Sequence, residues 1–202
     1  MAGSLVELWN RSLLAAGGKL IRDPVSDQGA DATHARTCWP GVRDAELRLH
    51  NWSFARVRVD LRPMAGVTVP SGWAYAFELP GDCLALRAVR VNNRPVPYEL
   101  ASLQIVSESG SAWRKVVLAD IEILPATYTR RVTETTLYDP LFDTAVVMSH
   151  AAELLYRIGY KQSKFDGLMA AHKLAIRQAV AANLIEKGRP QPEQDAVERG
   201  RS

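Results

Sequence analysis

Apolar residues recur with a helical period at both ends of the chain and at every second position in between. Near the N-terminus, several leucines and Trp9 fall on one helical stripe. Ser4 and Glu7 match a capping box, which predicts that a helix begins directly after Ser4. Gly17 predicts its end, because glycine readily adopts the left-handed conformation that closes helices. The pattern therefore predicts an amphipathic helix between Ser4 and Gly17.

A second helix is predicted over about residues 30–50, with Asp27 or Asp31 as its N-cap. Pro40 has no backbone N–H to donate, and Gly41 lowers helix propensity. We therefore expect a break or kink at this pair, after which the helix resumes at Val42. The second half mixes apolar with charged residues, as a partly exposed helix does.

From Phe54 onwards the period changes to two, which predicts β-strands. The first strand places Phe54, Arg56, Arg58 and Asp60 on one face and apolar residues on the other. Asn92 and the Asn that follows suit a tight hairpin turn, because asparagine tolerates positive φ. The predicted strands cover residues 54–61, 73–79, 84–91, 96–100, 104–107, 113–118 and 128–137.

Helical spacing returns after Asp139, which is placed as an N-cap with Pro140 as the first helical residue. This helix is predicted to reach Gly159, and a last helix, capped by Ser163, to reach Gly188. The remaining residues, 189–202, are polar and include prolines. We therefore expect this tail to be disordered in the isolated protein.

The predicted fold class is α+β: a bundle of four helices, two N-terminal and two C-terminal, with an inserted antiparallel β sandwich or barrel module. Helices at opposite ends of the chain must pack together to bury their apolar stripes. Residues 1–53 and 138–188 are therefore expected to form one discontinuous helical domain. Residues 54–137 form the inserted β module, and residues 189–202 form a flexible tail.

Aromatic residues concentrate where the second helix gives way to the strands. Trp73, Tyr75 and Phe77 alternate along one strand, so all three rings are expected on one face. We interpret this block as the seam between helical and β layers, and other aromatic residues as candidate interface anchors. The expected seam residues are Trp52, Phe54, Trp73, Tyr75, Phe77, Pro80, Asp82 and Cys83.

Composition narrows the class of protein only slightly. The net charge of +3 does not by itself call for a nucleic-acid partner. No apolar run approaches the roughly 20 residues that span a bilayer, and the N-terminus lacks the basic segment of a signal peptide. We therefore expect a soluble protein made in the cytoplasm, with no membrane partner. Cys38 and Cys83 are either buried thiols in a reduced compartment or one disulfide.

No catalytic, cofactor-binding or metal-binding pattern stands out. The sequence has no Gly-rich phosphate loop, no Gly-x-Ser-x-Gly and no His-Glu-x-x-His. His34 precedes Cys38 by one helical turn, yet no second pair completes a metal site. Arg130 and Arg131 are interpreted as a solvated strand edge, with a phosphate contact as the alternative. The carboxylates that could flank a glycosidic bond are interpreted as surface groups: Glu78, Asp82, Glu99, Asp120 and Glu122.

Several blocks of the sequence resemble the tail tubular protein A family of short-tailed bacteriophages, the head-to-tail adaptors beneath the portal. The most specific blocks are Trp-Ser-Phe-Ala at 52–55 and Trp-x-Tyr-x-Phe-x-Leu-Pro-x-Asp-Cys-Leu at 73–84. The resemblance runs over about residues 5–187 and departs from the family at Pro40-Gly41, where the family more usually continues a helix. The other matching positions are Trp9-Asn10, Ile21, Asp23, Cys38, Tyr98-Glu99, Tyr128, Arg131-Val132-Thr133 and Asp139-Pro140-Leu141-Phe142.

The resemblance implies a structural virion protein at the head–tail interface, without enzymatic activity or cofactor. It implies a closed ring of about twelve copies between the portal protein and a tail nozzle of the tail tubular protein B type. Double-stranded DNA would pass through the ring without sequence-specific binding, and the modest net charge suits such a channel. The last helix and tail are expected to order on contact with the portal. The candidate portal contacts are Arg189, Glu198, Arg199 and Arg201.

Two other classes remain open. A virion-associated cell-wall glycosidase would need two carboxylates with different pKa values in one groove. A DNA-binding accessory protein would need a basic recognition element and binding that weakens steeply with salt. The balanced charge of the predicted second helix argues against the DNA-binding class.

Overall fold

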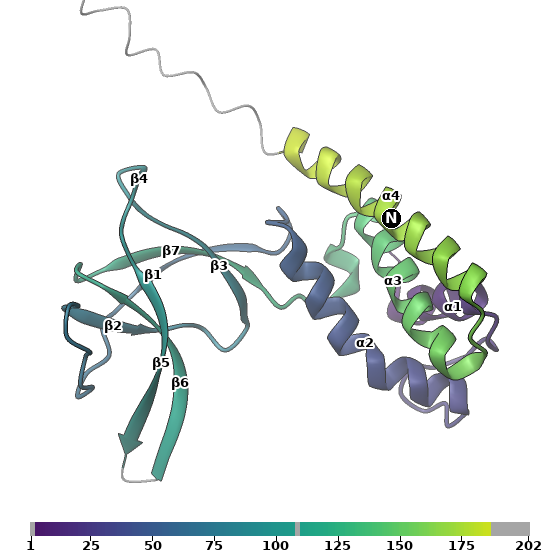
Figure 1. Cartoon of the computed structure of the whole chain (residues 1–202), viewed down its shortest axis with the longest axis horizontal. Helices are drawn as coiled ribbons and strands as arrows, with labels where there is room; N and C mark the ends of the chain where they lie inside the picture. The colour runs from purple at the N-terminus through teal and green to yellow at the C-terminus, as the bar shows by residue number, and fades with distance from the viewer. Residues whose placement is uncertain (1–2, 108–109, 187–202) are drawn as a thin grey trace, which may run out of the picture.

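The computed structural model describes residues 3–107 and 110–186, which contain four α-helices and two antiparallel sheets (Figure 1). The predicted α+β class is therefore confirmed. The helices are α1 (Leu5–Ala16), α2 (Ala30–Leu49), α3 (Pro140–Ile158) and α4 (Gln162–Glu186). The strands are β1 (Arg56–Leu61), β2 (Tyr75–Glu78), β3 (Cys83–Val91), β4 (Arg94–Pro95), β5 (Glu99–Ser107), β6 (Gly110–Ala119) and β7 (Leu124–Arg130), and a 3₁₀-helix, η1, spans Thr135–Leu137.

Local capping chemistry places several helix ends where the sequence predicts them. The Ser4 side chain accepts a hydrogen bond from the Glu7 backbone N–H, and Gly17 closes α1 with φ of 88°. Asp139 accepts from two backbone N–H groups at the start of α3, and Pro140 is its first residue. These predictions are confirmed because they depend only on residues within a few positions of each other.

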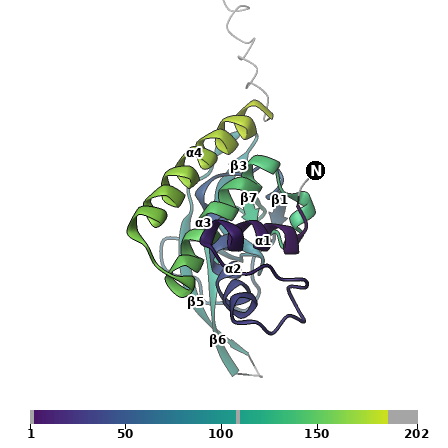
Figure 2. The ribbon, with the colours of Figure 1, turned by 90° about the vertical axis from the view of Figure 1, so that its right-hand side faces the viewer.

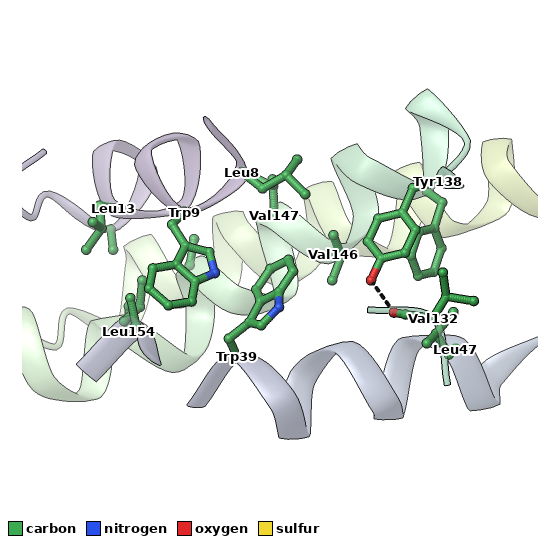
Figure 3. Close-up of a cluster of buried hydrophobic side chains, with 14 of the residues drawn as sticks. Leu8, Trp9, Leu13, Trp39, Leu47, Val132, Tyr138, Val146, Val147 and Leu154 are labelled. Carbon is green, nitrogen blue, oxygen red and sulfur yellow. Dashed lines mark hydrogen bonds between the residues drawn. The ribbon is translucent and has the colours of Figure 1, made fainter. Parts of the chain in front are cut away.

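The helical region shares one core (Figure 3). Leu8, Trp9 and Leu13 of α1 meet Trp39 of α2, whose ring centroid lies 6.2 Å from that of Trp9. α3 contributes valines and leucines to the same cluster, and α4 packs on α3 (Figure 2). The hydroxyl of Tyr138, just before α3, donates to the Val132 carbonyl at 2.8 Å. Helices from the two ends of the chain thus cover each other's apolar stripes.

The strands lie beside the helices in two sheets, ordered β1-β7-β3-β4 and β2-β6-β5 (Figure 1). One buried cluster joins side chains of both sheets, among them Phe77 of β2 and Val89 of β3. Asn92 and Asn93 adopt φ of 50° and 62°, which confirms the predicted turn. β5 and β6 form a long hairpin, so the strands predicted at 96–100 and 104–107 are replaced by the single strand β5.

Of the break or kink predicted at Pro40-Gly41, the break is wrong, because α2 runs without interruption from Ala30 to Leu49. The kink stays a prediction. Pro40 and Gly41 are exposed, whereas residues on both sides of the pair, including Trp39 and Leu47, are buried in the same core. Burial of both halves against the same neighbours outweighs the hydrogen bond that Pro40 cannot make. The predicted caps of this helix are also wrong, since Gly29 occupies the N-cap position.

The strand predicted over 128–137 is also wrong in its extent. β7 begins earlier, at Leu124, and ends at Arg130. Beyond it the chain turns into the helical region, where Val132 is fully buried and Tyr138 is 3% exposed. Two of the β-branched residues that suggested a strand, Val132 and Thr135, are instead buried in the connection to α3. α4 likewise begins at Gln162, so Ser163 lies inside the helix and is not its cap.

The three alternating rings do not share one face. Tyr75 and Phe77 pack in the cluster between the sheets. Trp73 precedes β2 and packs against Ala76, Val116 and Leu118 in a separate cluster on the opposite face. The strict alternation fails because Trp73 lies outside the regular strand, where the period-two geometry no longer applies.

Candidate interaction surfaces

Two of the eight predicted seam residues lie in the helical core. Trp52 is 1% exposed, its indole N–H donates to the Glu46 carbonyl at 3.1 Å, and its ring contacts that of Phe142 edge-on at 5.0 Å. Phe54 packs near the same rings, with its centroid 5.1 Å from that of Phe142. The segment between α2 and β1 is therefore fixed to α3 by aromatic contacts.

Pro80, Asp82 and Cys83 form the turn that leads into β3. The Cys83 N–H donates to the Pro80 carbonyl at 2.9 Å. The Asp82 carboxylate accepts from the Tyr128 hydroxyl at 3.1 Å, and burial raises the pKa of Tyr128 to about 12. Cys83 and Cys38 are free thiols whose pKa values are raised by burial, in the case of Cys38 to about 11. The turn residues serve to position β3 against β7.

The remaining seam residues, Trp73, Tyr75 and Phe77, contact the sheets and not the helical core. The residue that the sequence reasoning missed is Arg87 on β3. Its guanidinium donates to the carbonyls of Arg48 and His50, each at 2.8 Å, and to the Thr129 hydroxyl at 2.7 Å. A charged residue at the centre of a mostly apolar strand was the signal that could have pointed to it. Arg87 joins the C-terminal end of α2 to the sheet.

The predicted portal contacts Arg189, Glu198, Arg199 and Arg201 lie outside the described residues.

The carboxylates considered for glycoside cleavage each have a partner. Glu78 forms an ion pair with Arg114 at 3.3 Å, and the Glu99 carboxylate accepts from the Trp73 indole at 3.0 Å. Asp120 accepts from the Ala74 backbone N–H at 2.8 Å. Among residues 3–107 and 110–186, no three His, Cys, Asp or Glu side chains are grouped as a metal site would require.

Two histidines are held within the helical region. His150 is buried between Trp9 and Trp39, and burial lowers its pKa to about 4. His172 of α4 lies 3.0 Å from the buried Glu46 carboxylate of α2, and that hydrogen bond raises the pKa of the histidine. His150 is therefore a neutral core residue, whereas His172 links α4 to α2.

α4 carries apolar residues on two sides. Its inner side buries Ala175, Ala179 and Asn183. Its opposite side faces solvent, and Leu174 and Ile185 on it are 57% and 81% exposed. These two belong to a stripe at helical spacing, which we call the outer stripe of α4, formed by Ala170, Leu174, Gln178, Ala181 and Ile185. A helix with two apolar sides is typical of an element covered on both.

A second exposed apolar surface lies on the β5–β6 hairpin, far from α4 in Figure 1. Trp113 is 70% exposed and Leu100 is 57% exposed. Both side chains lie on the same face of the hairpin as buried Val117. Leu100 is the cross-strand partner of Val117, and Trp113 and its partner Gln104 are each four residues further along their strands, which keeps them on that face. The face that packs against the other sheet at Val117 is therefore exposed at Leu100 and Trp113. We call Leu100 and Trp113 the hairpin surface.

No known protein-family model matches the sequence, and no curated protein is detectably similar to it. Among the described helices, none is sufficiently long and apolar to cross a lipid bilayer.

Proposed function

We propose that this chain is a structural virion protein of a short-tailed bacteriophage, a head-to-tail adaptor that forms a ring between the portal and the tail nozzle. The proposal starts from the resemblance of residues 52–55 and 73–84 to the tail tubular protein A family. In this proposal a four-helix bundle, formed by residues 1–53 and 138–188, builds the body of the ring. Residues 54–137 form an inserted β sandwich or barrel, and the DNA channel runs through the hole.

The observation that carries the proposal is the presence of two unlike exposed apolar surfaces on one chain. A closed ring is built from heterologous contacts, in which one surface of a subunit meets a different surface of the next. The outer stripe of α4 and the hairpin surface differ in shape and composition, and they lie on distant elements. Large exposed apolar residues of this kind are typical of interface anchors.

The attachment of α4 suits a helix that also receives a partner. Only three of its residues are buried among residues 162–186, and two of them are alanines. Its C-terminal end is held by Asn183, which accepts from the Ser53 backbone N–H at 2.7 Å. In the proposal, the portal contacts this end of the molecule and orders the tail that follows, at residues 189–202.

The test is the mass of the full chain in solution, alone and after mixing with phage portal rings. The proposal expects a complex that holds many copies per portal, and a chain that ignores portal contradicts it. The double variant Leu174→Asp with Ile185→Asp should reduce assembly at least about tenfold, because each substitution places a charge in a buried apolar contact.

The matched control is Leu20→Asp with Val25→Asp, since these residues are 59% and 80% exposed but belong to neither surface. This control adds the same charge and should assemble like the unaltered chain. Equal loss of assembly in both variants would indicate a general effect of added negative charge and not a specific interface.

A further inference from the structure

The outward face of the four-stranded sheet carries a groove rich in arginine. Arg56 and Arg58 line it from β1, and Arg87 and Arg90 line it from β3. β7 runs between these strands and contributes Thr127 to the floor. The groove has a volume of about 530 Å³. It lies on the side of the sheet opposite the buried cluster of Phe77, Val89 and Leu124.

Within the described part of the chain, the four arginines of the groove have no acidic partner, unlike the arginines that form ion pairs. Arg43 and Arg131 form ion pairs with Asp44, and Arg114 and Arg130 with glutamates. Across residues 3–107 and 110–186, no carboxylate lies within ion-pair distance of the four arginines of the groove: Arg56, Arg58, Arg87 and Arg90. Asp60 is the single acidic residue in the lining, so the groove holds four positive charges against one negative charge.

The four arginine side chains differ in how firmly hydrogen bonds hold them in place. Arg87 is held by the carbonyls at the end of α2 and by Thr129, so it is a fixed charge in the floor. Burial and the nearby Arg48 lower the pKa of Arg87, as expected where cations are crowded without acids. Arg90 has one long hydrogen bond, of 3.3 Å to Asn93, and Arg56 and Arg58 have none to protein atoms that the structure describes. Three guanidinium groups are thus free to bind an anion.

The spacing suits a ligand with repeated negative charges. Side chains two residues apart on a strand are about 6.6–6.8 Å apart, and β1 and β3, separated by β7, are about 9.5 Å apart. The guanidinium group matches a phosphate with two parallel hydrogen bonds. Ala88 and Thr127 keep the floor low between the arginines, which lets a sugar–phosphate backbone approach. None of the described residues that line the groove belongs to a helix, the element that most often reads base edges in the major groove.

We propose that this groove binds the sugar–phosphate backbone of nucleic acid without sequence preference. The choice of duplex DNA as the ligand rests on the proposed adaptor function, whereas the anion site itself rests on the arginines. Such a site goes beyond passive passage of DNA, because it holds the backbone at a defined place on each subunit.

The experiment measures binding of the full chain to a fluorescent duplex of mixed sequence, of about 24 base pairs, by anisotropy over KCl from about 50 to about 200 mM. Three free arginines predict a slope of log affinity against log salt of about −2.7, which corresponds to a loss of roughly 40-fold over this range. The double variant Arg56→Ala with Arg58→Ala should reduce the slope to about −0.9 and the loss to roughly fourfold.

The matched control is Arg22→Ala with Arg177→Ala, which removes the same charge from exposed arginines outside the groove. The control should bind DNA with nearly the slope of the unaltered chain. Equal weakening in both double variants would overturn the site, because the binding would then come from overall charge. Binding of a polyglutamate peptide in preference to the duplex would also overturn it, in favour of an acidic protein partner.

Two further measurements show whether a loss of DNA binding comes from misfolding or from failure of the adaptor proposal. The melting temperature of the Arg56 and Arg58 variant should match that of the unaltered chain, and Arg58→Gln with Arg90→Gln repeats the test if it does not. The variant should still assemble with portal. Groove-dependent DNA binding without portal assembly would uphold the site and refute the adaptor, and portal assembly without DNA binding would do the reverse.

Discussion

The helical region and the β region divide their residues between core and surface in different ways. The helical core is one cluster that runs from Leu8 to Ala179 and includes three tryptophans. The β region has two smaller clusters, on opposite faces of the sheet β2-β6-β5. Its other surfaces carry unpaired arginines and the exposed Trp113. The comparison teaches that this chain concentrates its buried apolar residues in the helices and leaves much of the sheet surface exposed.

α4 is the exception within the helical region. It buries few residues and carries exposed apolar residues on its outer stripe, so it resembles the β region in having large apolar side chains exposed to solvent. Three predictions test how far the contrast between the regions holds, from the largest expected effect to the smallest.

The largest effect is expected from the helical core. Trp52→Ala should lower the free energy of unfolding by about 3–5 kcal/mol, because it removes a fully buried ring and leaves a cavity. Trp113→Ala should change it by less than about 0.5 kcal/mol, because that ring is 70% exposed. Urea denaturation measures both. Similar losses at the two positions would contradict the division between core and contact surface.

The second effect concerns pH. The folded pKa of His150, about 4, lies below the ordinary value of 6.5, so the unfolded chain binds the proton more tightly. Stability is therefore complete above pH 6.5 and is lost as the pH falls towards 4, by roughly 3 kcal/mol. In His150→Gln this acid loss should be much smaller, as measured by urea denaturation at several pH values.

His172 provides the control of opposite sign. Its folded pKa is raised, so its contribution is present below the unfolded value of 6.5 and is lost as the pH rises through the folded pKa. His172→Gln should therefore lower stability below pH 6.5, should have little effect above the folded pKa, and should leave the acid loss in place. An unchanged acid loss in His150→Gln would show that another group causes it.

The smallest of the three effects concerns the connection between the regions. Arg87→Ala should lower the free energy of unfolding by about 1–3 kcal/mol, because it leaves carbonyls at the end of α2 without their donor. Arg90→Ala, on the same strand but exposed, should cost less than about 0.5 kcal/mol. Calorimetry of both variants makes the comparison. Equal values would mean that Arg87 does not join sheet and helix energetically.

Sequence reasoning located a large part of the fold and part of the candidate sites. Alternation predicted that Phe54, Arg56, Arg58 and Asp60 share one face. The last three do line one groove, whereas Phe54 precedes β1 and packs against the helical core. Their partners Arg87 and Arg90 were not predicted as part of that surface. β3 lies beside β7 and β7 beside β1, and this order is set by pairing between strands distant in the sequence. An alternation within one strand carries no information about which strand lies next to it.

The sequence by itself determined the features that depend on neighbouring residues: the Ser4 and Asp139 caps, the Gly17 closure of α1, and the Asn92-Asn93 turn. Each follows from hydrogen bonds or backbone angles that span only a few positions. Only the tertiary structure decided that α2 continues through Pro40, that Trp73 packs away from Phe77, and that Val132 leaves the sheet for the helical core. These outcomes depend on burial against distant segments, which can outweigh a local preference of a few kcal/mol.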